Sequence, residues 1–186
     1  ASRAATVFPT ITPVAYAAMV SGEDPSTTGV RDRSVHRLSC PSIFDWAEAR
    51  GKSTCVIEGD LQILDLTANT TLNVDDDGDG LTDDEVFAAA RLRLAESQPD
   101  LMLVHFHGID DTAHAHGPFS SATVTYVRHA DAMVGALMKL WKGRLVVVAD
   151  HGLHAVGDAS EAGKQAEHGA FRSEDLFIPL LTGRTE

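Results

Sequence analysis

Residues 144–152 read RLVVVADHG, and this stretch decides the fold. A continuous apolar run that ends in an acidic residue and a histidine is typical of a strand covered on both faces in a parallel sheet. A second run of this kind, LMLVHF, occupies residues 101–106 and also leads into a segment rich in Asp and His. In open parallel sheets, ligands bind just beyond the carboxyl ends of the strands, so both segments are candidates for a functional site.

Shorter elements surround these two strands. Residues 52–58, 61–66 and 177–181 are expected to form further strands, and Pro179 indicates that the last is an edge strand or a strand end. Helical patterns lie between the strands. This alternation predicts an α/β fold with a mostly parallel sheet and helices on both faces, in a single domain over residues 1–186.

The helices carry two features that a structure can test. Thr82 and Glu85 have the spacing of a capping box. Asp131 falls on the apolar stripe of the longest helix, where a buried carboxylate bonded to the backbone is the expected role. The helices are expected at residues 42–50, before Gly51, at residues 83–97 and at residues 120–140, the last with a stripe of Val124, Val127, Val134, Leu137 and Met138.

Composition limits the choice of partners. The formal net charge is −12, and no stretch approaches the ~18 apolar residues of a membrane-spanning helix. So acidic a surface disfavours nucleic acid and anionic membranes as partners. A small anionic substrate remains compatible, because bound metal ions can invert the local field. Residues 1–6 show neither a signal-peptide pattern nor an initiating Met, as expected for a chain that is processed or cut from a longer one.

The cysteines give little structural information. Cys40 and Cys55 are too few for a disulfide scaffold. They either pair with each other or remain two ordinary buried thiols, and unpaired thiols are the expectation. The apolar core, rather than disulfides, is therefore expected to stabilise the chain.

Histidines gather in the second half of the chain, where short motifs place them beside carboxylates. Asp110 and His114 stand four apart in the loop after one apolar run, Asp150 and His151 follow the other, and His168 precedes a glycine further on. Each motif alone would suit an ordinary surface or core residue. Together they predict a metal site, because neutral imidazole and carboxylate suit Zn²⁺ and similar divalent ions.

A resemblance to a known family connects these motifs with one another. Residues 8–30, FPTITPVAYAAMVSGEDPSTTGV, resemble the nucleophile segment of type I phosphodiesterases and nucleotide pyrophosphatases, a branch of the alkaline phosphatase superfamily. That segment has a Thr at the start of a helix, a Gly ten residues on, then a Pro and another Gly, which here are Thr12, Gly22, Pro25 and Gly29. The resemblance spans nearly the whole chain and implies an alkaline phosphatase-like fold.

The same resemblance implies two divalent metal ions, which are zinc in the family. It implies hydrolysis of a phosphodiester, a pyrophosphate or a phosphomonoester through a phospho-threonine intermediate, with a small phosphate ester as substrate. His105, His107, His116 and His154 are expected to support the ligands or face the substrate. By family match, Asp110, His114 and His168 bind the first ion, Asp150 and His151 bind the second, and Thr12 is the nucleophile beside it.

Thr12 also suits this role on physical grounds. A threonine hydroxyl is a poor nucleophile at neutral pH and needs a metal or a base to activate it. Thr12 precedes Pro13, which favours the first turn of a helix, and a helix start offers N–H groups to a phosphate. Without the other motifs, an N-cap would be the preferred role for this residue.

The sequence departs from the family at two places. The second metal of the family takes one more Asp from an apolar strand followed by Asp-Gly, but only eleven residues precede Thr12 and none is acidic. The chain is therefore expected to lack the family's first strand, as a truncated or reduced member with a weak second site. Ala15 stands where nucleotide pyrophosphatases carry a phosphate-binding Asn, and losing such a donor can cost ~2.7–4 kcal/mol in the transition state.

Residues 74–86 form an acidic loop that resembles the calcium loops of thrombospondin-type repeats. Position 12 of the calcium pattern is Val86 rather than Glu, so a solvated acidic turn is the alternative. A structural Ca²⁺ is expected, and calcium is plentiful outside cells, which favours an exported protein. The expected ligands are Asp75, Asp77, Asp79, the carbonyl of Leu81, and Asp83.

The sequence thus predicts a metal-dependent hydrolase of phosphate esters. The main alternative is a catalytically incomplete, metal-binding remnant that serves as a binding or structural module. A metal-dependent mutase of the same superfamily would need further ligands that the motifs do not supply. Sulfate-ester hydrolysis is disfavoured because the signature Cys or Ser followed by x-Pro-x-Arg is absent.

Overall fold

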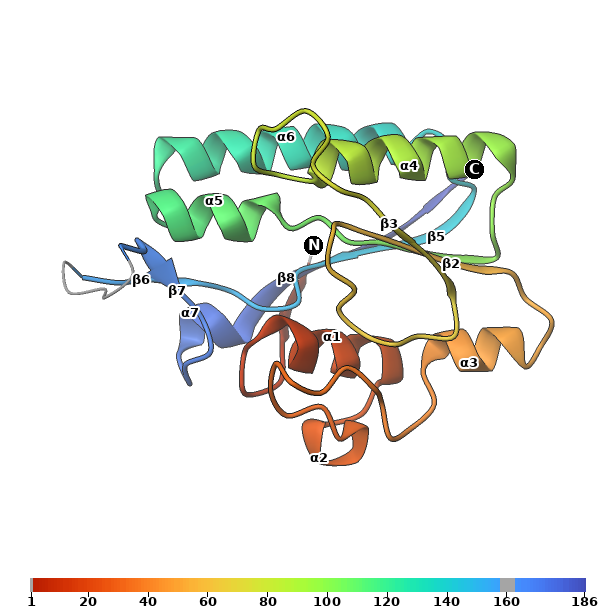
Figure 1. Cartoon of the computed structure of the whole chain (residues 1–186), viewed down its shortest axis with the longest axis horizontal. Helices are drawn as coiled ribbons and strands as arrows, with labels where there is room; N and C mark the ends of the chain where they lie inside the picture. The colour runs from red at the N-terminus through yellow and green to blue at the C-terminus, as the bar shows by residue number, and fades with distance from the viewer. Residues whose placement is uncertain (1, 158–162) are drawn as a thin grey trace.

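The computed structural model of the chain describes residues 2–157 and 163–186. Its strands form a middle layer, with α4, α5 and α6 on one side and α1, α2 and α3 on the other (Figure 1). The predicted α/β fold with helices on both faces of the strands is confirmed. The helices are α1 (Thr12–Ser21), α2 (Pro25–Thr28), α3 (Ile43–Glu48), α4 (Asp83–Glu96), α5 (Gly108–His116), α6 (Ser121–Met138) and α7 (Ser173–Leu176).

A parallel sheet of three strands, in the order β3-β2-β4, forms one half of the middle layer. The central strand β2 (Thr54–Glu58) is buried at every position and pairs with β3 (Asn69–Leu72) and β4 (Leu101–Val104). Its side chains alternate between two cores. Val56 packs with α1 and α3, while Cys55 and Ile57 pack with α4.

The strand expected at residues 61–66 does not form. Ile63 and Leu64 are buried in the core, but the N–H of Ile63 donates to the Glu58 carboxylate and the N–H of Leu66 donates to the carbonyl of Leu64. These local bonds turn the backbone and replace a strand ladder. The pairing partner of β2 comes a few residues later, as β3.

The second sheet has the order β1-β8-β5 and is antiparallel. The run at residues 144–149 was expected to be a parallel strand covered on both faces, but its strand belongs to this sheet and Val146 is exposed. It contains β1 (Ser2–Ala5), β5 (Gly143–Val148) and β8 (Phe177–Thr185), and a short ladder joins β6 (His154–Ala155) to β7 (Ala166–Glu167). Of the two positions expected from Pro179, the edge strand is wrong, because β8 is the central strand, whereas Pro179 does lie near the start of β8. Pro179 is tolerated since it lies opposite Arg3 of β1 and before Leu180, where pairing with β5 begins.

Helix ends and faces differ from expectation in two cases. Thr82 is the N-cap of α4, but its side chain makes no capping bond, and Glu85 instead accepts a hydrogen bond from the N–H of Asp76. In α6, Val124 and Val127 are 42% and 45% exposed and Asp131 is exposed as well. The buried face of α6 is Thr123, Ala130 and Met133, so the predicted stripe lies partly in solvent.

Two further expectations concern membranes and thiols. Among the described residues, no helix combines the length and the apolar character that crossing a bilayer requires. Cys40 and Cys55 are both free thiols, as expected, but only Cys55 is buried, in the core beside α4, while Cys40 is half-buried.

Candidate active site

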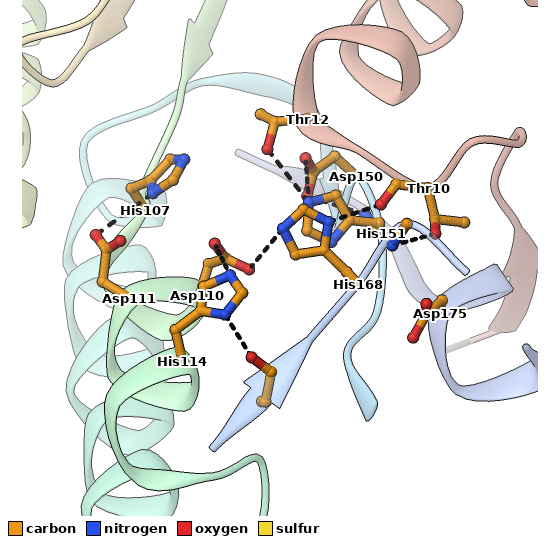
Figure 2. Close-up of polar contacts among 12 residues, drawn as sticks. Thr10, Thr12, His107, Asp110, Asp111, His114, Asp150, His151, His168 and Asp175 are labelled. Carbon is orange, nitrogen blue, oxygen red and sulfur yellow. Dashed lines mark hydrogen bonds and ion pairs between the residues drawn. The ribbon is translucent and has the colours of Figure 1, made fainter. Parts of the chain in front are cut away.

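The first candidate metal group joins α5 to the segment after β7. Asp110 and His114 lie on α5, so they share one face of a helix rather than a loop as expected, and His168 approaches from the other side (Figure 2). His114 Nε2 is 3.2 Å from Asp110 Oδ2, and His168 Nε2 is 3.9 Å from Asp110 Oδ1. One ligand atom from each residue lies within 4.8 Å of the others. The structure therefore brings together all three residues expected to hold the first ion.

Backbone carbonyls orient both imidazoles of this group. His114 Nδ1 is 2.7 Å from the carbonyl oxygen of Ala166, and His168 Nδ1 is 2.8 Å from that of Thr10. A carbonyl oxygen can only accept, so Nδ1 carries the proton and Nε2 presents its lone pair to the group. Asp110 Oδ1 is buried without a hydrogen-bond partner among the described residues. An unpaired carboxylate oxygen facing two imidazole lone pairs fits a divalent cation.

Burial sets the protonation of His168. Desolvation, together with the neighbouring ring of His151, lowers the pKa of His168 to about 4. The imidazole is therefore neutral near pH 7, which is the form that binds a metal.

The second group follows β5 and meets the start of α1. His151 Nε2 lies 3.3 Å from Asp150 Oδ2 and 3.2 Å from the hydroxyl oxygen of Thr12. His151 Nδ1 is 3.1 Å from the carbonyl oxygen of Gly152, so Nε2 again faces the site. The rings of His151 and His168 stack with their centroids 3.9 Å apart, which joins the two groups into one site (Figure 2).

Thr12 occupies the first turn of α1, as expected. Ile11 is the N-cap, so the side chain of Thr12 does not cap the helix. The side chain of Thr12 is buried. The helix start offers fewer donors than expected, because Pro13 has no N–H and the N–H groups of Val14 and Ala15 both donate to the carbonyl of Ile11. Ala15 is fully buried, and its methyl group offers no hydrogen-bond donor to a phosphate.

Sequence reasoning missed the residues that hold the nucleophile segment in place. The hydroxyl of Thr10 accepts a hydrogen bond from the N–H of Gly169 and donates to the carbonyl of Ala170, and its own carbonyl holds His168. Asp175 is fully buried and accepts from the N–H of Ala170 and from His154 Nδ1. No motif marks Thr10 or Asp175, since their roles depend on contacts across about 160 residues of chain and on a short helix, α7.

The remaining histidines divide into supporting and distant ones. His154 supports Asp175, and His116 is exposed at the end of α5. His107 pairs with Asp111 at 3.4 Å, and the hydrogen bond with Asp111 raises the pKa of His107 to about 9. Burial, with the charges of His107 and His151, lowers the pKa of His105 to about 3.

His105 belongs to a buried polar cluster behind the site. Its ring lies 5.3 Å from that of Tyr16, and its Nδ1 is 3.9 Å from Glu58 Oε1. The Tyr16 hydroxyl and Glu58 Oε1 are buried and have no hydrogen-bond partner among the described residues. Burial raises the pKa of both groups, most strongly for Tyr16, which also faces the charge of Glu58. This cluster was not predicted, because its members are far apart in the sequence and match no motif.

The acidic loop gathers only part of its expected calcium set. Asp75, Asp77 and Asp79 have carboxylate oxygens within 4.8 Å of one another. Leu81 follows in the same turn, with its N–H donating to Asp79. Asp83 points elsewhere, because its buried carboxylate accepts hydrogen bonds from the N–H groups of His107 and Gly108 and from the Tyr126 hydroxyl. Asp83 therefore anchors α4 to the start of α5 and is not available to a loop ion.

Comparisons with known proteins show the family and the fold of the chain. The family described as type I phosphodiesterase/nucleotide pyrophosphatase matches residues 60–168, a stretch that includes the five candidate metal ligands but not Thr12. No curated protein matches the chain.

Solved structures show the same fold at low sequence identity. Phosphonoacetate hydrolase from Sinorhizobium meliloti 1021 is 18% identical with a TM-score of 0.65, over 84% of this chain and 49% of that one. Murine ectonucleotide pyrophosphatase/phosphodiesterase 5 is 17% identical with a TM-score of 0.65 over the same shares. A 2-O GAG sulfatase is 16% identical with a TM-score of 0.69, over 97% of this chain and 55% of that one.

This chain thus spans about half the length of the solved structures that it matches. The family match covers more than half of the 186 residues and contains both strand-end motifs that form the site. The chain therefore belongs to the type I phosphodiesterase/nucleotide pyrophosphatase family.

Proposed function

We propose that this chain carries the phosphoryl-transfer site of a metal-dependent hydrolase of phosphate esters, with Thr12 as the nucleophile. One observation supports this most strongly. The Thr12 hydroxyl, from the first turn of α1, lies 3.2 Å from His151, and the ring of His151 stacks on that of His168. A nucleophile and two ligand groups from distant parts of the chain therefore share one site.

The residues of the chain fit two divalent ions, with zinc proposed for both positions. Asp110, His114 and His168 would hold the first, and Asp150 and His151 would hold the second beside Thr12. Bound cations would lower the pKa of the Thr12 hydroxyl and offset the charge of the phosphate. The protein's own contribution is to orient the rings of His168 and His114 through their carbonyl contacts, so that Nε2 of each faces the ion.

The proposed reaction has two displacements. The Thr12 oxygen forms a bond to phosphorus, the bond from phosphorus to the alcohol or phosphate leaving group breaks, and the hydroxyl proton leaves to solvent or to that group. Water then cleaves the phosphorus–oxygen bond of phospho-Thr12, which releases phosphate or a phosphate monoester and restores the hydroxyl. Because phosphoryl transfer depends mainly on positioning and charge neutralisation, the fixed orientation of these side chains is the main requirement.

The proposed substrate is a small phosphate ester. Among the similar structures, the Sinorhizobium phosphonoacetate hydrolase is in complex with phosphonoformate, and an inactive threonine-to-alanine variant of the murine protein is in complex with AMP. Both ligands are small and carry a phosphoryl or phosphonyl group, which supports a substrate of that class for this chain.

A second proposal is a metal-binding module without turnover. Among the described residues, the second group supplies only Asp150 and His151 beside Thr12, and the buried Ala15 offers no polar side-chain atom to a phosphate. The chain also spans only about half of its structural neighbours. These observations favour a first ion that binds well and a second that binds weakly.

Elemental analysis and turnover of bis-p-nitrophenyl phosphate on the same samples distinguish the two proposals. The hydrolase predicts two zinc-like ions per chain, fewer in His114→Ala and in Asp150→Ala, and turnover that follows the metal content. One ion in the wild type, lost in His114→Ala, with no turnover by any sample, would reject the hydrolase for this chain and support the binding module.

The acidic loop supports a further, structural ion. We propose that Asp75, Asp77 and Asp79 bind Ca²⁺, since their oxygens already lie close together. Such an ion suits an exported protein. The ion would offset the repulsion of the carboxylates and fix the turn before α4.

A further inference from the structure

A groove lies beside the acidic loop, where β3 ends and α4 passes over it. It has a volume of about 410 Å³ and is lined by apolar side chains from both elements. Leu72, Val74 and Leu92 line it and are 45%, 65% and 62% exposed. Exposed apolar side chains that gather at a hollow, rather than standing singly, are typical of a binding surface.

The groove adjoins an open strand edge. β3 is the outer strand in the order β3-β2-β4, so its far side has no strand partner among the described residues. An edge of this kind presents N–H and C=O groups with the spacing of a strand, which is a template for an added strand. An extended segment could therefore pair with β3 and place a side chain in the groove at its end.

Carboxylates form the polar side of the same groove. Asp76 and Glu85 both line it, and the N–H of Asp76 donates to Glu85 Oε1 at 3.0 Å. Glu85 Oε2 is buried and has no hydrogen-bond partner among the described residues. Asp77 and Asp84 lie close to Glu85, and their charges add to the field at this point. A guanidinium or ammonium group at this side of the groove would offset the charge of these carboxylates.

We propose that this groove and the free edge of β3 bind an extended peptide segment in which an apolar and a basic residue stand two positions apart, on the same face of the segment. The backbone of the segment would pair with β3, an apolar side chain would cover Leu72, Val74 and Leu92, and an Arg or Lys would contact Asp76 and Glu85. A metal ion alone would leave the apolar side chains uncovered, and a helix could not pair with a strand edge. The proposal is independent of the proposed hydrolase activity and concerns a surface outside the site of Thr12.

Fluorescence anisotropy with synthetic peptides tests this proposal. The probe is a labelled peptide in which valine and arginine take turns at every second position, with threonine between them, and its matched control has glutamate in place of each arginine. The basic peptide should bind the purified chain, and the acidic one should bind at least about tenfold more weakly, as expected for the loss of one charge-assisted hydrogen bond. Methylation of alternate backbone nitrogens on the basic peptide should abolish its binding, because it removes the N–H groups that pair with β3.

Matched variants locate the binding. Glu85→Gln and Leu92→Asp should each weaken the binding of the basic peptide by about tenfold or more. Leu140→Asp is the control, since Leu140 is 45% exposed but lies just past the end of α6 and outside the groove. Unfolding temperatures of the variants, measured alongside, should match the wild type. Equal binding of both peptides, or an effect of Leu140→Asp as large as that of Leu92→Asp, would overturn the proposal.

Calcium separates a peptide surface from a simple cation site. Binding of the basic peptide should persist in Ca²⁺ and in EDTA, because the peptide contacts Asp76 and Glu85 and the loop ion would offset only the neighbouring charge of Asp77. Loss of peptide binding on addition of Ca²⁺ would show that Glu85 belongs to a metal site and would reject the proposal.

Discussion

The two candidate metal groups are built to different degrees of completeness. In the first, Asp110, His114 and His168 surround one point, and both imidazoles are held by backbone carbonyls. In the second, Asp150 and His151 are neighbours in sequence, and the third polar atom is the hydroxyl of Thr12. The first group offers three side chains of its own to an ion, whereas the second offers two and would depend on Thr12 or on a ligand from elsewhere.

Replacing the nucleophile should have the largest effect. Thr12→Ala removes the hydroxyl that the second group contacts, so turnover of bis-p-nitrophenyl phosphate should fall by roughly 10³-fold or more. Thr12→Ser keeps the hydroxyl and should retain measurable turnover. The first ion should remain in both variants, as measured by elemental analysis. Equal activity in Thr12→Ala and the wild type would exclude Thr12 as the nucleophile.

Removing one ligand from each group should show that the two groups bind their metal ions with different affinities. His114→Ala takes the closest imidazole away from Asp110, so the affinity for the first ion should fall at least roughly 100-fold. Asp150→Ala should leave that affinity nearly unchanged and remove only the weaker ion. Titration with zinc, followed by calorimetry, measures both constants. If the two variants lose the same ion, the groups form one binding site rather than two.

The protonation of His168 should make the metal-free protein sensitive to acid. Burial lowers the pKa of His168 to about 4, from an ordinary value near 6.5. Stability from the neutral ring is fully present above pH 6.5 and is lost as the pH falls towards 4, because the unfolded chain takes the proton first. The loss is at most ~3 kcal/mol.

Thermal melts in EDTA between pH 7 and pH 4 measure this loss. His168→Gln removes the titrating group and should reduce the slope of unfolding temperature against pH. His116→Gln is a suitable control, because His116 is exposed at the end of α5. A slope that is unchanged in His168→Gln would show that another group controls the acid sensitivity.

The acidic loop should respond to calcium more weakly than the first group responds to zinc. Ca²⁺ at about 100 times its dissociation constant should stabilise the chain by ~2.7 kcal/mol, and Asp77→Asn should remove this gain. Asp83→Asn should keep the calcium response but lower the stability in its absence by ~1–3 kcal/mol, since its carboxylate accepts buried hydrogen bonds from His107, Gly108 and Tyr126. Differential scanning calorimetry with and without Ca²⁺ measures both effects. A calcium response lost in Asp83→Asn would contradict its placement.

The sequence was sufficient to predict the features that depend on local patterns of residues. β4 lies within the run at residues 101–106, β5 covers most of the run at residues 144–149, and the Asp and His residues beyond them meet at one site. The run at residues 144–149 did not reveal that β5 pairs antiparallel with β8 or that Val146 is exposed. Partners that depend on distant contacts were missed. Pro179 suggested an edge, yet β8 is central because its pairing with β5 starts only at Leu180. Asp83 matched a calcium position by spacing, but burial and three hydrogen bonds hold it against α5 and α6.

The carbonyl of Thr10 that holds His168 has a consequence for how the chain reaches its native state. These residues are 158 positions apart, so the contact forms only after the two ends of the chain have met. Closing so long a loop is slow compared with forming local helices such as α5. Uptake of the first metal should therefore be a late event in folding, and its rate should report the arrival of the C-terminal segment rather than the formation of secondary structure.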